Sequence, residues 1–490
     1  MVLNKVARNL IFVLIVTALI WAAVIIYWQE THRQVTAGDV GVYLIALPLI
    51  AVISWYVARG IFRWAVDTPV PKNVAAPQDG SAAAAKIASL EAQERGYLLA
   101  ITGSAAHSAA GQSAEEILAA LKEQTIKPES DPDLQDSRGF AIRSARVIDL
   151  DTTEAEAWWA NYDEIVTASG KSLAPAPQFF LRALALLQAP LTASVDMLAR
   201  YSPLVFAEAK SSGGTPNIKP GLMVAIAATS GLEESHKIAL RAYVEGQLSR
   251  LEWPPERITI TLLAPSDGTA IIQLVDRYSV RVNREGLQDI LLLLGSDSLI
   301  DEHVVAQLES EQRLHTSEQL QGIVPGEAAA AVLFTPPGWK NAEPPVAFIH
   351  RAALGLRDKS ADAGGRITPD LVCALAEQAL VAGNAQAADI AAVVSDCDHR
   401  SSRVIESAGM MNQLLPELDP IADRVSLGDA LGHIGAAGTV LLFALAAERA
   451  KTDDKPNLLL AVAHPTECAV FVMRHQPKPE AAPAATPAAA

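Results

Sequence analysis

One histidine stands among small residues at the start of an apolar run. It is His433, in the segment SLGDALGHIGAAG from Ser426 to Gly438. An imidazole can transfer protons near neutral pH or stabilise a developing oxyanion, so His433 is a candidate catalytic residue. Glycines also let a backbone approach its neighbours closely, which would give Gly435 and Gly438 a structural role. Both interpretations of the segment stay open at this point.

Two other segments carry residues that could act with His433. Ser266, in TLLAPSDGTAIIQ, is either a nucleophile or the N-cap of the following helix. Asp396 stands near Asp398 and His399 in VVSDCDHRSSRV, with no fourth ligand in a recognisable spacing. We therefore expect a solvated loop there and no metal site. A hydrolase triad of Ser266, His433 and Asp396 is the alternative, although the G-x-S-x-G elbow of such enzymes is missing.

The composition limits both the redox chemistry and the partners. The chain carries 39 basic and 55 acidic residues, a net charge of -16, which opposes binding to nucleic acid. Its three cysteines, Cys373, Cys397 and Cys468, have no paired spacing and stand in apolar sequence. We expect them to be reduced and buried as small core hydrophobes. We expect no cofactor.

The candidate residues would be positioned by the elements of an α/β fold. Short aliphatic or β-branched runs predict strands that begin near residues 97, 140, 222, 257, 289, 328, 389, 457 and 468. Helical runs separate them, among them 113–124, 177–189, 234–251, 368–383 and 438–450. Nearly continuous apolar strands with intervening amphipathic helices predict a sheet that is covered on both faces.

Two apolar runs near the N-terminus predict a transmembrane hairpin. Leu10 to Trp28 and Val40 to Val57 contain no Asp, Glu, Lys, Arg or His, and each is about as long as a bilayer-spanning helix. Basic residues precede the first run and follow the second, so we expect both chain ends in the cytoplasm. The first run lacks a small-x-small cleavage site, which argues against a removed signal peptide.

Composition divides the chain into five segments. Residues 1–64 form the predicted hairpin anchor, and residues 65–95 form a linker rich in proline and alanine. Residues 96–340 and 341–476 each contain one round of the strand and helix pattern, and residues 477–490 form a disordered tail. We therefore expect two α/β halves behind a membrane anchor.

Three segments follow one another in an informative order. They are LLLLGSDSLID from Leu291, QGIVPGEAAAAVLF from Gln321, and LGHIGAAGTVLLFALA, which contains His433. Together they resemble the second half of a β-ketoacyl synthase of the thiolase superfamily, in which PGE and GHTxGAAG motifs recur. The resemblance implies a thiolase-like duplication in α/β/α/β/α layers and aligns His433 with the second catalytic histidine. The structural motif residues beside the expected pocket are Gly326, Glu327, Gly435 and Gly438.

The resemblance also implies a mechanism that this sequence retains only in part. Members of the family condense acyl groups through a cysteine thiolate at a helix N-terminus, assisted by two histidines. In the family that cysteine lies in a turn between a strand and a helix. The corresponding segment here, TLLAPSDGTAIIQ, has Ser266 and no cysteine. The segment expected to hold the first histidine has His399 without the glycines that follow it in the family. We therefore expect a catalytically inactive protein in which His433, Ser266 and Asp396 are vestiges of a site.

Divergent synthase-like proteins of this kind are similar to ones associated with bacterial type VI secretion. The resemblance implies an adaptor at the bacterial inner membrane that binds a secreted effector or the secretion machinery, with its hairpin in the lipid bilayer. The alternative is an acyltransferase, condensing enzyme or esterase that uses His433 on a membrane-derived acyl substrate. Edge strands form a dimer interface in the family, so a homodimer is a further expectation.

Overall fold

The computed structural model describes residues 21, 91–206, 220–228, 231–263, 269–339, 344–453 and 455–475. The chain separates into two compact units, Met1–Ala85 and Lys86–Ala490, and the second unit is the one described below. The predicted hairpin apart from Trp21, the predicted linker apart from residues 91–95, and the predicted tail lie outside the described residues. Among the described helices, none combines the length and the apolar character that a bilayer span requires.

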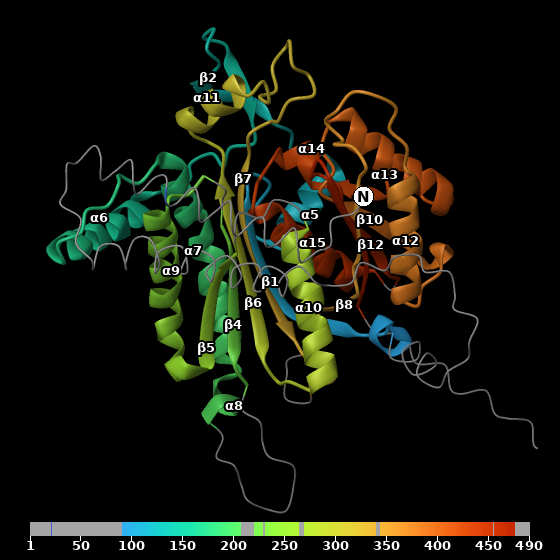
Figure 1. The fold of residues 1–490 in the computed structure, drawn as a ribbon, viewed down its shortest axis with the longest axis horizontal. Coiled ribbons are helices and arrows are strands. Elements are labelled where there is room, and N and C mark those ends of the chain that lie inside the picture. Colours follow the sequence, from blue (N-terminus) through green and yellow to red (C-terminus); the bar gives the residue numbers. More distant parts are fainter. Residues whose placement is uncertain are drawn as a thin grey trace, which may run out of the picture. The chain divides into compact units, whose positions relative to one another are not determined.

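Eleven strands of this unit form one mixed sheet (Figure 1). The strand order is β11-β10-β12-β13-β8-β1-β7-β6-β4-β5, and β9 also pairs with β13. The strands are β1 (Leu98–Ser108), β4 (Leu222–Ala227), β5 (Ile258–Leu263), β6 (Ile290–Ser298), β7 (Glu327–Thr335), β8 (Ala347–His350), β9 (Ala353–Leu356), β10 (Ala392–Ser395), β11 (Arg424–Ser426), β12 (Asn457–Ala461) and β13 (Glu467–Arg474). β6 and β7 are buried along their whole lengths because both faces of the sheet are covered.

The sheet repeats one arrangement of strands. We call β1 and β4–β7 the N-terminal half-sheet, and β8–β13 the C-terminal half-sheet. With β9 left out of the count, the third strand of each half along the chain lies at the edge, followed in space by the second, fourth, fifth and first. The second strand pairs in parallel with the third and fourth, and the fifth is antiparallel to its neighbours in both halves. β1 pairs with β8 and joins the half-sheets.

Helices form three layers around the half-sheets (Figure 1). Outer helices on the N-terminal side are α6 (Thr153–Ala168), α7 (Gln178–Ala199) and α9 (Glu234–Leu248), and those on the C-terminal side are α12 (Asp370–Ala382) and α13 (Ser401–Leu414). The inner layer holds α5 (Ala114–Glu123), α10 (Ala270–Glu285) and α15 (Ala437–Thr452). α15 contacts both half-sheets and is apolar almost all round, as expected of a central helix. The predicted α/β class is confirmed.

A small β-hairpin projects at the end of the sheet where the C-termini of the parallel strands lie. It consists of β2 (Glu129–Gln135) and β3 (Ala141–Ser144), which pack with α11 (Glu302–Ser310) around a separate apolar cluster. The sequence predicted one longer strand from residue 140, but only Ala141–Ser144 is a strand. Farther along, Val147 N donates to the Glu327 side chain at 2.8 Å and not to a strand neighbour, so the ladder ends. Two further α-helices are short, α8 (Ser202–Phe206) and α14 (Leu427–Leu431), and short 3-10 helices span Ser249–Leu251, Pro255–Arg257 and Ala387–Asp389.

Candidate functional site

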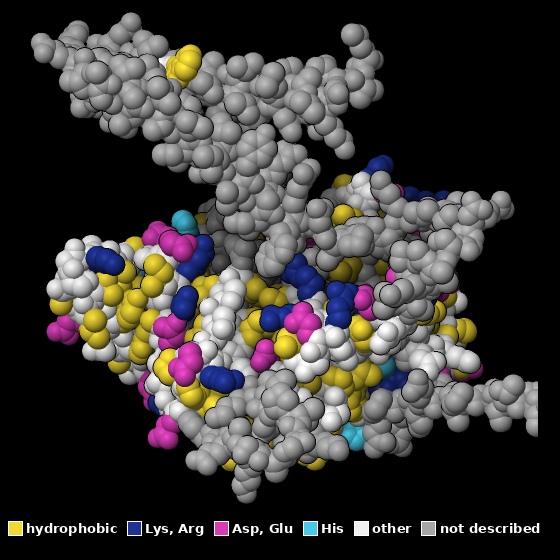
Figure 2. All heavy atoms as spheres, turned by 60° about the horizontal axis from the view of Figure 1, so that its bottom comes forward, with side chains coloured by type: hydrophobic (Ala, Val, Ile, Leu, Met, Phe, Trp, Pro, Cys, Tyr) yellow, Lys and Arg dark blue, Asp and Glu magenta, His cyan; other side chains and the backbone are white. Residues whose placement is uncertain are grey.

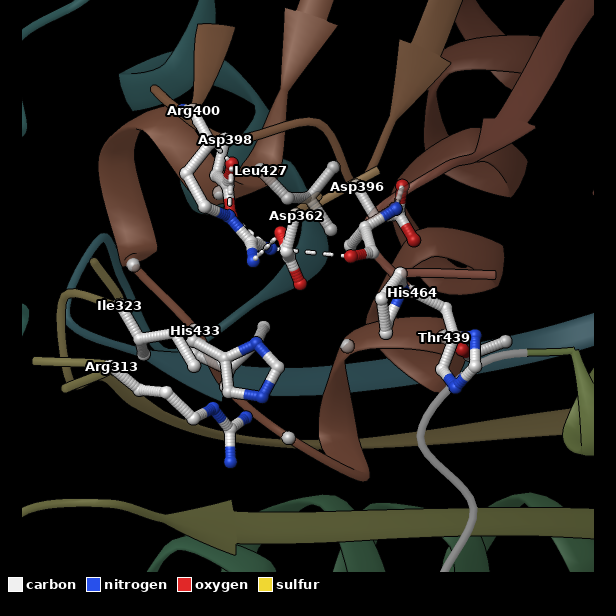
Figure 3. A pocket seen from close by; sticks show the side chains of 17 residues that line it. Arg313, Ile323, Asp362, Asp396, Asp398, Arg400, Leu427, His433, Thr439 and His464 are labelled. Carbon is white, nitrogen blue, oxygen red and sulfur yellow. Dashed lines mark hydrogen bonds and ion pairs between the residues drawn. The ribbon is translucent and has the colours of Figure 1, made fainter. Parts of the chain in front are cut away.

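His433 lies in the turn between α14 and α15. Its backbone N donates to Val324 O at 2.8 Å, and its carbonyl accepts from Gly326 N at 3.1 Å. These two hydrogen bonds join the GHIGAAG turn to the PGE segment, so two motifs that are distant in sequence form one local structure. The imidazole is half-buried and lines a pocket, shown in Figure 3.

The motif glycines differ in how closely their neighbours approach. A Cβ at Gly326 would lie 1.9 Å from Leu431 O, and a Cβ at Gly435 would lie 1.9 Å from Asp297 Oδ2. Gly435 also has a φ of +48°, in the left-handed region that favours glycine. At Gly438 a Cβ would make only an ordinary contact at 3.5 Å. The structural role predicted for Gly435 and Gly438 depends on a close approach of neighbouring atoms. The contacts show such an approach at Gly435 and not at Gly438.

Two hollows are lined by this turn, and a third lies beside them. The first has a volume of about 110 Å³, and His433, Asp396 and His464 are among the residues that line it (Figure 3). The second has a volume of about 240 Å³ and the third about 450 Å³. Arg313 and Ile323 line all three hollows, so the three are neighbours. We call them together the His433 groove.

Asp396 follows β10 and reaches the groove where the parallel strands end. Its Oδ1 accepts hydrogen bonds from Val462 N at 2.6 Å and from Ala463 N at 3.0 Å. Burial raises the pKa of Asp396 to about 6, although these two hydrogen bonds oppose the shift, and the charge of Asp398 adds to it. A carboxyl group with such a pKa can exchange a proton near neutral pH.

His464 is a groove residue that the sequence analysis missed. Its Nδ1 accepts hydrogen bonds from Glu467 N at 3.0 Å and from Thr466 N at 3.3 Å. Since two N–H groups donate to Nδ1, the proton of the neutral imidazole sits on Nε2, which can donate to a ligand. The signal was available: His464 ends the run NLLLAVAH, just beyond a predicted strand, at the edge of a parallel sheet where ligands bind.

The solvated loop predicted after β10 is wrong. Asp398 and Arg400 are buried and form an ion pair, with Asp398 Oδ2 2.8 Å from Arg400 Nη2. Burial by itself would raise the pKa of Asp398, but the hydrogen bonds and charge of Arg400 lower it. His399 packs its ring against His315, with the ring centroids 4.9 Å apart. In the part of the chain that the structure describes, no group of three or more His, Cys, Asp or Glu side chains is placed to hold a metal ion.

Carboxylates hold the N-termini of both central helices. Ser266 lies outside the described residues, but α10 begins at the next described segment. Thr269, its N-cap, donates from N at 3.1 Å and from Oγ1 at 2.6 Å to Glu467 Oε2. Asp297 Oδ2 accepts from Ala436 N, at the N-cap of α15, at 2.9 Å. Each half-sheet therefore supplies a carboxylate to the positive end of the other half's central helix.

The three cysteines are core residues, as predicted. Cys373, Cys397 and Cys468 are free and buried. Burial raises the pKa of Cys397 and of Cys468 to about 12, and it also raises the pKa of Cys373. Thiols in such surroundings stay protonated at neutral pH, so they are poor nucleophiles.

Glu327 of the PGE segment joins elements rather than facing the groove. Its Oε2 accepts from Arg182 Nε at 2.8 Å and from Ser298 Oγ at 2.7 Å. Its Oε1 accepts from Val147 N at 2.8 Å. Because the carboxylate is fully buried and paired, it fixes the PGE segment to α7 and β6.

Known proteins are similar to this chain in structure and not in sequence. No family model matches the sequence, and no curated protein matches it. Solved ketosynthases do match the structure. A β-ketoacyl synthase from Burkholderia phymatum STM815 covers 78% of this chain and 100% of its own, at 15% identity and a TM-score of 0.51. An oxazolomycin ketosynthase domain of Streptomyces albus JA3453 covers 80% and 76%, at 13% identity and a TM-score of 0.51. The fold is that of a ketosynthase.

The ketosynthase of module 6 of the bacillaene synthase from Bacillus subtilis 168 gives the same result. It covers 77% of this chain and 72% of its own, at 11% identity and a TM-score of 0.51. Within this ketosynthase fold, His433 stands just before the central helix α15, where the resemblance placed a histidine. The loop expected to supply the other histidine contributes Asp396 to the groove, and His464 arrives from the loop before β13.

Proposed function

We propose that this protein is a membrane-anchored binding protein with a ketosynthase fold that forms no cysteine-bound acyl intermediate. The observation that carries the proposal is the N-terminus of α10, where Glu467 accepts both hydrogen bonds of Thr269. A helix N-terminus lowers the pKa of a nucleophile only when its positive end is available to that nucleophile. Here a resident carboxylate offsets it, and the preceding elbow contains no cysteine.

The His433 groove supports a binding role. Charged and amide side chains line it, so it suits a polar segment of a partner better than an acyl chain. On the face drawn in Figure 2, the basic and acidic side chains of the described residues are interspersed, which favours a protein partner over nucleic acid. The proposal extends to an adaptor at the bacterial inner membrane that holds a type VI secretion effector, and this extension rests on the sequence resemblance.

The absence of an acyl intermediate is tested by intact-protein mass spectrometry. The full chain in detergent is incubated with acyl-coenzyme A donors, with an active ketosynthase as the positive control. We expect no acyl adduct, and we expect the cysteines to react with iodoacetamide only after denaturation. An adduct on a cysteine or on Ser266 would overturn the proposal.

The binding role is tested with two matched charge reversals. Arg313 is 56% exposed, lines the groove and pairs with Glu311, whereas Arg281 is 57% exposed and pairs with Glu285 on α10. The full chain and the variants Arg313→Glu and Arg281→Glu are crosslinked in membranes and quantified by mass spectrometry. We expect an effector or a component of the secretion machinery to be lost from Arg313→Glu and retained by Arg281→Glu. Equal recovery by both variants contradicts a role of the groove.

A second candidate is an esterase or acyltransferase, and one observation favours it. Asp396, with its raised pKa, lies with His433 and His464 around one pocket, an arrangement suited to acid–base chemistry. Short acyl esters and acyl-coenzyme A provide the substrates for the test. Turnover that rises through the pKa of Asp396 and falls at least 100-fold in His433→Ala would establish this function. Turnover that His433→Ala leaves unchanged would eliminate it.

A further inference from the structure

Two buried guanidinium groups converge on a half-exposed carboxylate at the edge of the His433 groove. The side chain of Arg403 is 0% exposed and that of Arg400 is 7% exposed, whereas that of Asp362 is 48% exposed. Arg403 Nη1 lies 2.5 Å and Arg400 Nη1 lies 3.2 Å from Asp362 Oδ1. A charged group is seldom buried without a counter-charge, so two buried guanidinium groups require two negative charges close by.

Among the groups that the two arginines contact, the charges balance only when Asp362 is counted. Asp398 is buried and pairs with Arg400 at 2.8 Å. The other groups on Arg403 are neutral: Ala463 O accepts from Nη2 at 3.1 Å, and Ser402 Oγ accepts from Nη1 at 2.8 Å. Two guanidinium groups and one buried carboxylate leave one positive charge, which Asp362 neutralises. Without Asp362, the same place would attract one anion.

Asp362 stands on a short loop that opens to the third hollow of the groove. The loop is fixed before it by Ala361 N, which donates to Pro465 O at 2.7 Å. Gly364 and Gly365 follow, and a Cβ at either would meet nothing within 4 Å, so the loop has free space around it. The hollow, of about 450 Å³, is also lined by Ser401 and Ser402.

The first turn of α13 adds to the attraction for an anion. Arg400 is the N-cap of this 14-residue helix, and Ser401 and Ser402 are its first two residues. Ser401 N and Oγ already donate to Gln321 Oε1, at 2.8 Å and 2.9 Å, so the helix contributes the partial positive charge of its N-terminus, which reinforces the two guanidinium groups, and not a free Ser401 N–H. Guanidinium groups bind carboxylates and phosphates through charge-assisted hydrogen bonds, so the ligand chemistry is one anionic oxygen group.

We propose that Arg400 and Arg403 form an anion subsite at one end of the His433 groove, and that Asp362 occupies it until a carboxylate or phosphate monoester of a ligand displaces it. The exchange replaces one anion by another, so the buried guanidinium groups keep a counter-charge throughout. This inference deepens the proposed function, because it names the chemical group that the groove takes from a partner. The tests use small anions and no partner, so their failure would leave the binding role in place.

The first test compares two Asp→Asn variants on the same loop. Asp362→Asn removes the negative charge from the subsite and so weakens the hold of residue 362 on it, whereas Asp358→Asn removes the same charge from an exposed residue four positions earlier. Thermal unfolding of the full chain in detergent is recorded in chloride, acetate or inorganic phosphate at one ionic strength. We expect Asp362→Asn to be less stable than wild type in chloride and to gain about 3 °C in acetate or phosphate. The anion that gives the larger gain identifies a carboxylate or a phosphate source.

Asp358→Asn and wild type should respond weakly, because the tethered Asp362 carboxylate competes at a high effective concentration. Equal shifts for all three proteins would overturn the subsite. If Asp362→Asn does not fold, hydrogen exchange of the wild-type chain decides the question. Inorganic phosphate at a concentration high enough to compete with the tethered Asp362 carboxylate should then speed exchange in residues 358–367 and slow it in residues 401–406. Unchanged exchange in both segments would overturn the proposal.

Discussion

Gly435 and Gly438 occupy equivalent-looking places in one motif, but their surroundings differ. The first has a positive φ and lies against the carboxylate that caps α15, whereas the second is already inside the helix. A methyl group at Gly435 therefore collides with Asp297, and a methyl group at Gly438 does not. The side-chain environment, rather than the motif, decides what each glycine does.

This difference predicts opposite effects of two alanine substitutions. Gly435→Ala should lower the free energy of unfolding by more than about 2 kcal/mol, because it combines a left-handed backbone with displacement of Asp297. Gly438→Ala should leave stability unchanged or raise it by up to about 1 kcal/mol, because alanine favours the helix. Urea titrations of the full chain in detergent measure both. Similar losses for the two variants would contradict the assigned roles.

Asp396 predicts a specific dependence of stability on pH. Its pKa is raised from 3.8 to about 6 by burial, so the folded state binds the proton more tightly than the unfolded state. The contribution of this carboxyl to stability is therefore greatest below pH 4 and declines as the pH rises through 6. Asp396→Asn lacks that decline, so its unfolding temperature relative to wild type should increase from pH 4 to pH 7. Asp358→Asn is the control, and a constant difference for Asp396→Asn would disprove the shift.

The residues that the sequence did not reveal depend on distant partners. Glu467 has no motif around it, and its role follows from Thr269, which is 198 positions away. His464 has a sequence signal in its place just beyond a predicted strand, but its nearness to Asp396 depends on the pairing of β12 with β10, which the sequence does not show. His433 was predictable because its turn must be made of small residues, and that requirement is visible in sequence.

At the scale of elements, each of the helices α10 and α15 has its N-terminus hydrogen-bonded to a carboxylate from the other half of the sheet. β13 supplies Glu467 to α10, and β6 supplies Asp297 to α15. α15 begins at the groove, where Ala436, Gly438 and Thr439 line it, so the position of this helix determines the shape of the groove. The same contacts leave neither helix N-terminus available to a nucleophile, which links a packing feature to the proposed loss of condensation.

This arrangement predicts that Glu467→Ala and Glu467→Gln differ. Alanine removes the acceptor for both hydrogen bonds of Thr269, which should cost about 1 kcal/mol of stability and speed hydrogen exchange in residues 270–275. Glutamine keeps an oxygen acceptor and should remain within about 0.5 kcal/mol of wild type. Hydrogen exchange followed by mass spectrometry measures the local effect. Exchange that is equally fast in both variants would show that the carboxylate charge, rather than the hydrogen bonds, holds the helix.

The long apolar elements could be read from the sequence, and the short polar ones could not. β6 and β7 are covered on both faces, so their runs of aliphatic residues stand out against the more polar segments that flank them in the sequence. β2 has the sequence ESDPDLQ, in which acids and proline mask the strand, and β11 has only three residues. Those strands form because tertiary partners hold them, and local propensity does not predict them.

At the scale of the whole molecule, the strand order is repeated, but the inner apolar core is formed by residues of both halves. The inner apolar layer draws Ile271 and Val275 from α10, Phe443 from α15 and Phe471 from β13. Phe443 packs between Phe334 of β7, to which its ring is edge-on at a centroid distance of 5.7 Å, and Phe471, to which its ring is tilted by 33° at 5.3 Å. The halves resemble each other in topology, yet each lacks one wall of its own core.

The shared core predicts that the halves do not fold separately. If residues 86–340 and 341–490 are expressed as separate chains, α15 and the inner faces of both half-sheets lose their cover, and the apolar surface drives aggregation or partial folding. Residues 86–490 in one chain retain every wall of the core and serve as the control. Circular dichroism should show one cooperative thermal transition for the control and none for either half. A sharp transition in an isolated half would mean that its outer core alone sustains the fold, and the central layer would then be a docking interface between two independent domains.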